Sequence, residues 1–181
     1  MTPRTLVLGG ARSGKSAHAE GLLTADAATY VATSRRDPAD AEWTERIAAH
    51  VARRPAGWRT VEAGAADGPA EVLEAAGADD PPLLVDDVAT WLTGVLDDAG
   101  AWDRDPAALR AVAAHTDRFA TAAARCPARL VLVSSEVGLG IVPATRSGRL
   151  FRDELGALNA RLAEVCERVV LLVAGVPLAL R

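Results

Sequence analysis

Short apolar runs alternate along the chain with longer segments of helical periodicity. The apolar runs predict strands over residues 5–8, 28–33, 58–62, 83–85, 129–134 and 169–173. Helices are predicted over residues 16–24, 41–54, 69–76, 90–96, 107–124 and 150–166. Apolar strands separated by helices are typical of a parallel sheet covered on both faces. We therefore expect one three-layer α/β domain over residues 1–181.

Three segments carry finer detail. In residues 41–54, a stripe of Trp43, Ile47 and Val51 at four-residue spacing predicts one docked helix face. After the last apolar run, the turn at residues 175–177 favours an antiparallel hairpin at one edge of the sheet. Residues 97–106 are polar enough to predict an exposed loop.

Composition narrows the class of protein. The 181 residues are 50% hydrophobic and 24% charged, which indicates a globular chain rather than a disordered one. The longest apolar run is far shorter than the roughly 20 residues needed to span a bilayer. The first residues show no apolar segment of signal-peptide length. We expect a cytoplasmic protein without stable membrane insertion.

Charge and cysteine content exclude further classes. The formal net charge is −4 and the isoelectric point is near 5.4, which gives no support for a nucleic-acid partner. Cys126 and Cys166 lie in no CxxC or Cys/His cluster, so we expect buried reduced thiols. His18 and His115 are expected to be structural or exposed.

The strongest motif follows the first predicted strand. Residues 9–16 fit the phosphate-loop pattern G-x-x-x-x-G-K-[ST] in full, with a strand before it and a helix after it. Lys15 is the single lysine of the chain, and every other of the 20 basic residues is arginine. Backbone N–H groups of such a loop surround phosphate oxygens, the lysine reaches the terminal phosphates, and the Ser16 hydroxyl is predicted to ligate Mg²⁺. The predicted nucleotide contacts are Gly9, Gly10, Ala11, Arg12, Ser13, Gly14, Lys15 and Ser16.

A second carboxylate for Mg²⁺ is expected at the end of a neighbouring strand. Asp86 and Asp87 follow the apolar run 83–85, and alternation would direct only one of them toward the phosphates. We favour Asp86 for the magnesium or substrate side. The alternative is a helix N-cap, which suits Asp87 better.

His50 lies among arginines on the predicted helix 41–54. Arg46, His50 and Arg53 or Arg54 share one face at helical spacing, and nearby positive charge favours a neutral imidazole. A neutral imidazole can attack phosphorus while the arginines hold the phosphates. From the residues alone, a surface histidine on a basic helix is the favoured interpretation.

These motifs resemble one family in order along nearly the whole chain. The loop 9–16 is similar to the Gly-Gly-x-Arg-Ser-Gly-Lys-Ser loop of the bifunctional adenosylcobinamide kinase/adenosylcobinamide-phosphate guanylyltransferase family of cobalamin biosynthesis. The segments 30–34, 46–55, 58–62, 135–143 and 149–153 also match, with Asn159 and Arg161 beyond them. The Glu-Val-Gly-x-Gly-Ile-Val-Pro segment at 136–143 is more specific than a phosphate loop alone.

The resemblance implies a RecA-like P-loop fold, a homotrimer and two activities. A nucleoside triphosphate, ATP or GTP, would phosphorylate adenosylcobinamide. GTP would then transfer GMP to a histidine, which matches His50, and onward to adenosylcobinamide phosphate, giving adenosylcobinamide-GDP. His50 and Lys15 are therefore the expected catalytic residues.

The resemblance also extends the nucleotide site by position. It implies contacts from Thr33, Ser34, Arg54 and Glu62. We also expect nucleotide contacts from Arg35, Arg53 and Asp86. Glu62 would accept hydrogen bonds from a guanine edge that adenine lacks. Ala89, Gly94 and Ser135 depart from the residues usual in the family. The alternative function is a simple P-loop small-molecule kinase without a covalent intermediate; a motor-type nucleotide switch is disfavoured by the acidic charge.

Overall fold

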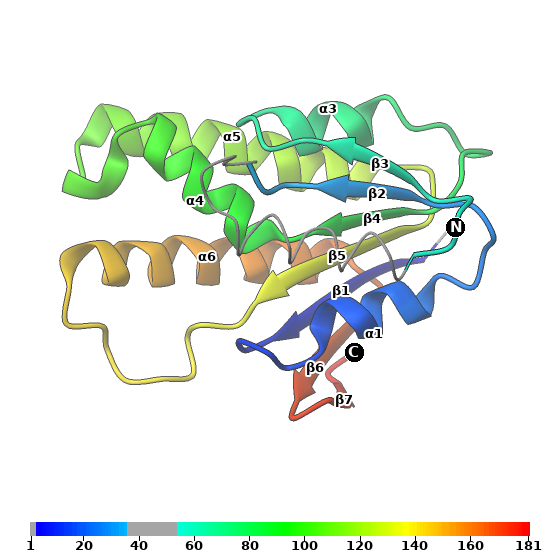
Figure 1. The fold of residues 1–181 in the computed structure, drawn as a ribbon. Helices are drawn as coiled ribbons and strands as arrows, with labels where there is room; N and C mark the ends of the chain where they lie inside the picture. Colours follow the sequence, from blue (N-terminus) through cyan, green and yellow to red (C-terminus); the bar gives the residue numbers. More distant parts are fainter. Residues whose placement is uncertain (1–2, 36–53) are drawn as a thin grey trace.

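The computed structural model describes residues 3–35 and 54–181. These residues form a seven-stranded sheet in the order β3-β2-β4-β5-β1-β6-β7. All neighbouring strands are parallel except β6 and β7, which form an antiparallel edge hairpin (Figure 1). The predicted fold class is confirmed. The strands are β1 (Arg4–Gly9), β2 (Thr29–Ala32), β3 (Arg59–Glu62), β4 (Leu83–Asp86), β5 (Leu130–Ser135), β6 (Arg168–Val173) and β7 (Val176–Ala179).

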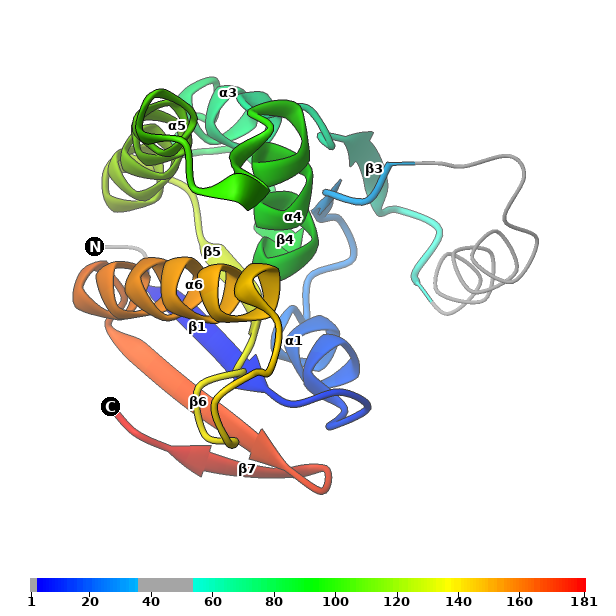
Figure 2. The same cartoon turned by 90° about the vertical axis from the view of Figure 1, so that its left-hand side faces the viewer.

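Helices cover both faces of the sheet, as Figure 2 shows. One face carries α1 (Lys15–Leu22), and the other carries the remaining described helices. Each face has its own buried cluster, one around Trp91 and Phe119 and a smaller one around Val7 and Tyr30. The helices on the face with the larger cluster are α3 (Gly68–Glu74), α4 (Val88–Asp98), α5 (Pro106–Arg125) and α6 (Arg146–Val165).

Several element boundaries differ from the sequence prediction, and two of the differences have a clear physical reason. Helix α6 begins at Arg146 rather than at residue 150, because Thr145 caps it by accepting a hydrogen bond from the Gly148 N–H at 3.1 Å. The prediction of an exposed loop over residues 97–106 is confirmed for the exposure of most of these residues and wrong for their lack of regular structure. Helix α4 continues to Asp98, and a 3₁₀ helix (Ala101–Asp103) follows with Ala101 fully buried. The Trp102 indole donates to Asp97, so polar residues here support structure instead of a free loop.

The remaining expectations for the core hold. Cys126 and Cys166 are both free and buried, which confirms the prediction of reduced thiols. Among the helices that the structure describes, none has the length and apolar character that crossing a membrane requires. The predicted helix 41–54, with its stripe of Trp43, Ile47 and Val51, falls almost wholly outside the described residues.

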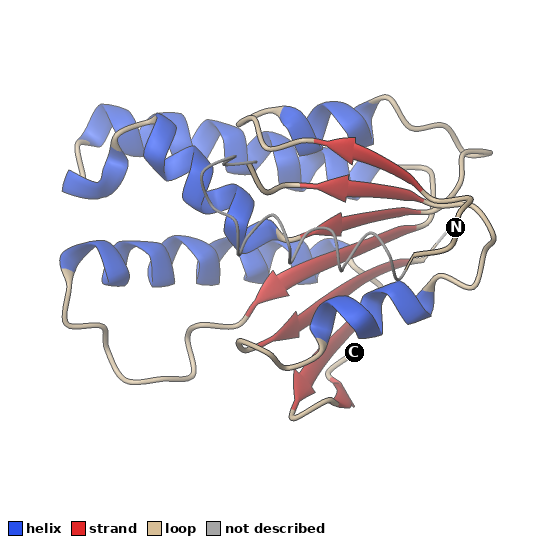
Figure 3. Cartoon of the chain, in the orientation of Figure 1, coloured by secondary structure: helices blue, strands red, loops and turns tan. Residues whose placement is uncertain are grey.

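The carboxyl ends of the parallel strands meet at one edge of the sheet, where the long connection 136–145 also lies (Figure 3). In open α/β sheets, ligands bind outside the carboxyl ends of the strands. The phosphate loop leaves β1 at this edge.

Candidate nucleotide-binding site

The phosphate loop turns tightly between β1 and α1. Gly14 has a φ of +89° and precedes the first residue of α1, where its carbonyl accepts from the His18 N–H at 2.9 Å. A residue with a side chain is strained at such a φ, which explains the second glycine of the motif. The N-terminus of α1 therefore points its free N–H groups at the loop, which suits an anion.

The loop is closely packed on its inner side. A Cβ atom added to Gly9 would lie 2.3 Å from the Ser13 Oγ, so a larger residue there would require Ser13 to shift. The Ser13 hydroxyl is buried and has no hydrogen-bond partner among residues 3–35 and 54–181. On the opposite side, the Gly175 N–H in the β6–β7 turn donates to the Ser13 carbonyl at 3.1 Å. The loop is thus supported by a turn from the edge hairpin, and its Ser13 hydroxyl is left unsatisfied by the described part of the chain.

Asp86 joins the phosphate loop from the end of β4. Its carboxylate interacts with Ser16 and Lys15, and both interactions favour the ionised carboxylate. The Tyr30 hydroxyl donates to Asp86 Oδ2 at 2.8 Å. Burial and then the Asp87 charge raise the pKa of Asp86, while the Tyr30 and Ser16 hydrogen bonds and Lys15 oppose the rise. The hydroxyl and the carboxylate are hard oxygen donors, so this pair fits Mg²⁺.

Asp87 points elsewhere. Its side chain accepts from the Thr90 N–H at 2.6 Å and caps α4, as the alternative interpretation for this residue predicts. The Asp87 carbonyl accepts from the buried Thr33 hydroxyl at 2.7 Å. Thr33 is therefore fixed directly after β2, next to the strand end that carries Asp86.

A family model described as cobinamide kinase / cobinamide phosphate guanyltransferase matches residues 5–180. The chain belongs to this family. The match includes the phosphate loop, Asp86 and the edge hairpin in one continuous alignment.

Three relatives of this cobinamide kinase / guanyltransferase family cover nearly the whole chain. The bifunctional adenosylcobalamin biosynthesis protein CobP of Pseudomonas aeruginosa is 42% identical over 182 residues, 98% of this chain and 97% of the relative. The bifunctional protein CobU of Escherichia coli is 41% identical, covering 94% of this chain and 96% of the relative. The CobU protein of Salmonella typhimurium is 41% identical with the same coverage.

A solved structure shares the fold without close sequence similarity. It comes from a structural and biochemical analysis of an ATPase of the type III secretion system of pathogenic bacteria, with a TM-score of 0.56 and 12% identity. It covers 94% of this chain, whereas this chain spans 51% of that protein. The structural similarity to this ATPase supports a P-loop fold for the present chain.

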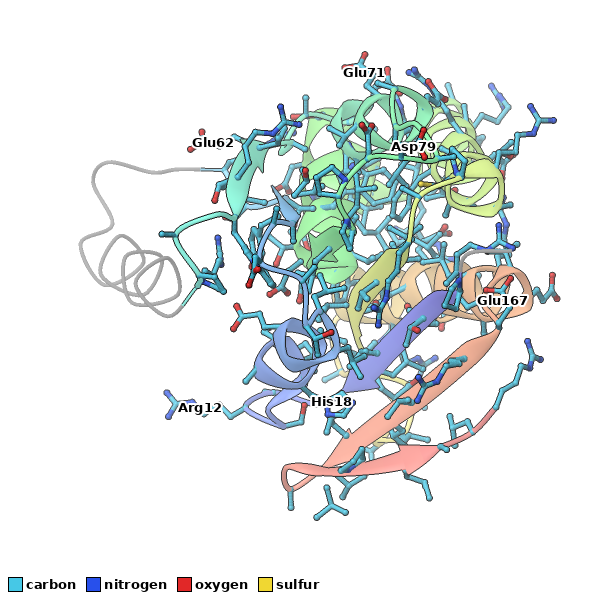
Figure 4. The ribbon with its side chains drawn as sticks, turned by 90° about the vertical axis from the view of Figure 1, so that its right-hand side faces the viewer. Arg12, His18, Glu62, Glu71, Asp79 and Glu167 are labelled. Carbon is cyan, nitrogen blue, oxygen red and sulfur yellow. The ribbon has the colours of Figure 1, made fainter. Side chains whose placement is uncertain are left out.

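Several residues that we expect to contact a nucleotide have other partners here. Arg35 donates to the Gly64 carbonyl at 2.9 Å and pairs with Asp98 on α4. Arg12 is exposed and extends away from the sheet, and Glu62 lies at the end of β3 beside Ala32 of β2 (Figure 4). Ser34 follows Thr33 in the same connection. Their contact with a nucleotide stays a prediction.

Arg54 is the described part of the arginine-rich segment of this family member. Its guanidinium lies over the Tyr30 ring, with Cζ 3.2 Å from the ring centroid, and 6% of the side chain is exposed. Its Nε lies 3.7 Å from a carboxylate oxygen of Glu20 on α1. The predicted catalytic His50, together with Arg46 and Arg53, lies outside the described residues.

Sequence reasoning missed three contributors to the site. Tyr30 is the single tyrosine of the chain and lies two residues before Ala32, the register partner of Asp86. Because side chains alternate along β2, the Tyr30 and Asp86 side chains lie on the same face of the sheet. This could have been predicted if the strand order had been known. Glu20 and Gly175 gave no such signal, because their contacts join distant segments.

Proposed function

We propose that this protein is a bifunctional enzyme of cobalamin biosynthesis. A single domain over residues 1–181 carries both activities. It phosphorylates adenosylcobinamide with ATP or GTP. It then transfers GMP from GTP, through guanylylated His50, to adenosylcobinamide phosphate, giving adenosylcobinamide-GDP. Family membership over residues 5–180 carries the proposal, and the phosphate loop with its Ser16–Asp86 pair supports it.

The chain's own groups supply binding and charge. The loop N–H groups and the start of α1 bind phosphate oxygens, and Lys15 offsets negative charge on the terminal phosphates. Ser16 and Asp86 would hold Mg²⁺, which neutralises phosphate charge when it is bound. Glu136 accepts from the Gly138 N–H at 2.6 Å, so it orders the loop 136–145 beside the site.

In the nucleotidyl step, a His50 ring nitrogen attacks the α-phosphorus of GTP. An N–P bond forms as the P–O bond to the leaving pyrophosphate breaks. A phosphate oxygen of adenosylcobinamide phosphate then attacks the same phosphorus, the N–P bond breaks, and free imidazole is restored. The covalent intermediate divides one difficult transfer into two easier ones.

The test uses GTP labelled at the α-phosphate. We expect acid-labile, base-stable label on the wild-type protein and none on His50→Ala. Incubation with adenosylcobinamide and GTP should yield both the phosphorylated and the GDP-linked product by mass. Lys15→Ala should lower both activities. Phosphorylated product without protein labelling would favour the simple kinase and refute the bifunctional assignment.

We also propose a cytoplasmic homotrimer. Exposed apolar side chains occur in the edge hairpin and in the connection 136–145. Both segments lie in the lower part of Figure 1. Large exposed apolar groups favour burial between copies, and an open edge strand favours pairing. The residues are Leu139, Ile141, Val142, Val173, Val176, Leu178 and Leu180.

A further inference from the structure

A chain of polar contacts crosses the sheet face beneath α1. It runs from Arg54 to the Tyr30 ring and from the Tyr30 hydroxyl to Asp86. Tyr30 lies in the buried cluster of that face and is 5% exposed. A tyrosine in such surroundings needs a partner for its hydroxyl, and here the partner is a carboxylate of the nucleotide site.

The sheet register explains the contact. Ala32 of β2 is opposite Asp86 of β4, and Tyr30 lies two residues earlier on the same face. The long side chain therefore reaches diagonally to Asp86 Oδ2 at 2.8 Å. Because Asp86 also interacts with Ser16, its carboxylate lies between Tyr30 and the phosphate loop. These two contacts determine its orientation toward the phosphate loop.

Arg54 holds the ring of Tyr30 in place. Its guanidinium covers one ring face, and its Nη1 donates to the Thr60 hydroxyl on β3 at 3.3 Å. The Glu20 carboxylate attracts it across 3.7 Å, too far for a hydrogen bond. Arg54 thus lies between β2, β3 and the helix that follows the phosphate loop, and its stacking favours the ring position from which Tyr30 reaches Asp86.

We propose that Tyr30 is a positioning residue that orients Asp86 toward Mg²⁺ bound with the nucleotide. The inference rests on the proposed function only in taking Asp86 as the magnesium-side carboxylate. Tyr30 itself touches neither metal nor nucleotide. It acts through its hydroxyl on Asp86, in the way that outer hydrogen bonds orient carboxylate ligands.

The first experiment measures GTP binding by titration calorimetry, with Mg²⁺ and with EDTA, for wild type and Tyr30→Phe. The phenylalanine keeps the ring under Arg54 and removes only the hydroxyl. We expect GTP affinity in Mg²⁺ to fall about tenfold and affinity in EDTA to stay unchanged. The matched control is Thr116→Val, which removes another buried hydroxyl, bonded to the Ala113 carbonyl on α5, and should leave both affinities unchanged.

The second experiment tests whether Tyr30 acts through Asp86. Asp86→Asn and the double variant with Tyr30→Phe should show the same Mg²⁺ dependence, because the two losses share one interaction. In the labelling assay, Tyr30→Phe should raise the half-saturating Mg²⁺ concentration while the rate at saturating Mg²⁺ is kept.

Three results would overturn the inference. One is wild-type Mg²⁺ dependence in Tyr30→Phe. Another is an equal loss of affinity in EDTA, which would report general damage to the nucleotide site. The third is a double variant in which the effects of Tyr30→Phe and Asp86→Asn on Mg²⁺ dependence add in full. A wild-type protein that binds Mg²⁺-GTP but is not labelled would instead refute the proposed function, and the binding comparison would still decide the role of Tyr30.

Discussion

Adjacent carboxylates at the end of β4 have different tasks. Asp86 contacts Ser16 and Tyr30, whereas Asp87 caps α4. Alternation along the strand separates them, so the predicted division of roles follows from backbone geometry. The placement of Asp86 beside Ser16 could be anticipated because the phosphate loop and a neighbouring strand end must meet at one edge of a parallel sheet.

Asp87→Ala removes the cap and should lower the free energy of unfolding by about 1 kcal/mol. Urea unfolding followed by circular dichroism measures the change. GTP affinity in Mg²⁺ should stay near the wild-type value. If stability were unchanged and Mg²⁺-dependent GTP binding lost, Asp87 rather than Asp86 would be the magnesium-side residue.

An ion pair links the start of β1 to the start of β6. The Arg4 side chain and its backbone N–H each donate to Glu167 at 2.6 Å. The side-chain hydrogen bond, followed by the backbone one, lowers the pKa of Glu167 from 4.5 to about 2. Because the folded pKa is depressed, the stabilisation is complete above pH 4.5 and is lost as the pH falls toward 2.

Glu167→Gln should therefore destabilise the protein at pH 7 and have little effect near pH 2. The full shift would correspond to about 3 kcal/mol. Solvent screening of side chains that are 15% and 38% exposed reduces this to about 1 kcal/mol. Urea unfolding at several pH values measures it, with Glu164→Gln on α6 as the control. An equal loss of stability at pH 7 and pH 2 would show that packing, not charge, is responsible.

At the scale of elements, the edge hairpin supports the phosphate loop. The β6–β7 turn holds Gly175 at a φ of +80°, and its N–H donates to the Ser13 carbonyl. Gly175→Ala should lower the free energy of unfolding by about 1 kcal/mol, since an L residue is strained at that φ. It should also weaken GTP binding several-fold, measured by calorimetry, because the support of the loop shifts.

Gly156→Ala is the matched control for that substitution. Gly156 is exposed within α6, and an added Cβ meets nothing within 4 Å. The alanine should raise the free energy of unfolding by about 0.5–1 kcal/mol without changing GTP affinity. A Gly175→Ala protein that is destabilised yet binds GTP normally would separate the hairpin from nucleotide binding.

Helix ends were less predictable than helix existence. The caps at Thr145 and Asp105 are short-range signals, and Asp105 with Pro106 begins α5 one residue before the predicted start. The regular structure within residues 97–106 was not predicted because the segment is polar. In the fold, Trp102 donates a hydrogen bond to Asp97 and Ala101 packs into the core. Composition records polarity but not these pairings.

At the scale of the whole molecule, the exposed apolar surface at the hairpin end predicts self-association. Ile141 is 95% exposed and Val176 66% exposed. Ile141→Asp combined with Val176→Asp should convert the assembly to monomers in sedimentation equilibrium, because buried aspartates would lose hydration.

Ala114→Asp provides the control for charge alone. Ala114 is exposed on α5, which lies at the other end of the sheet from β7 (Figure 2). This variant should keep the wild-type mass. Monomeric wild-type protein at micromolar concentration, or an unchanged assembly in the double variant, would contradict the proposed trimer interface.

The sequence by itself determined the contiguous features of this protein. The phosphate loop, the alternation of strands and helices and the cap at Asp87 depend on neighbouring residues, so local backbone preference and periodicity are enough to predict them. Only the tertiary structure decided which distant groups meet. Tyr30 and Asp86 are 56 positions apart, and Gly175 reaches Ser13 from the far end of the chain. These contacts follow from the strand order and register, which long-range burial selects and which no local spacing encodes.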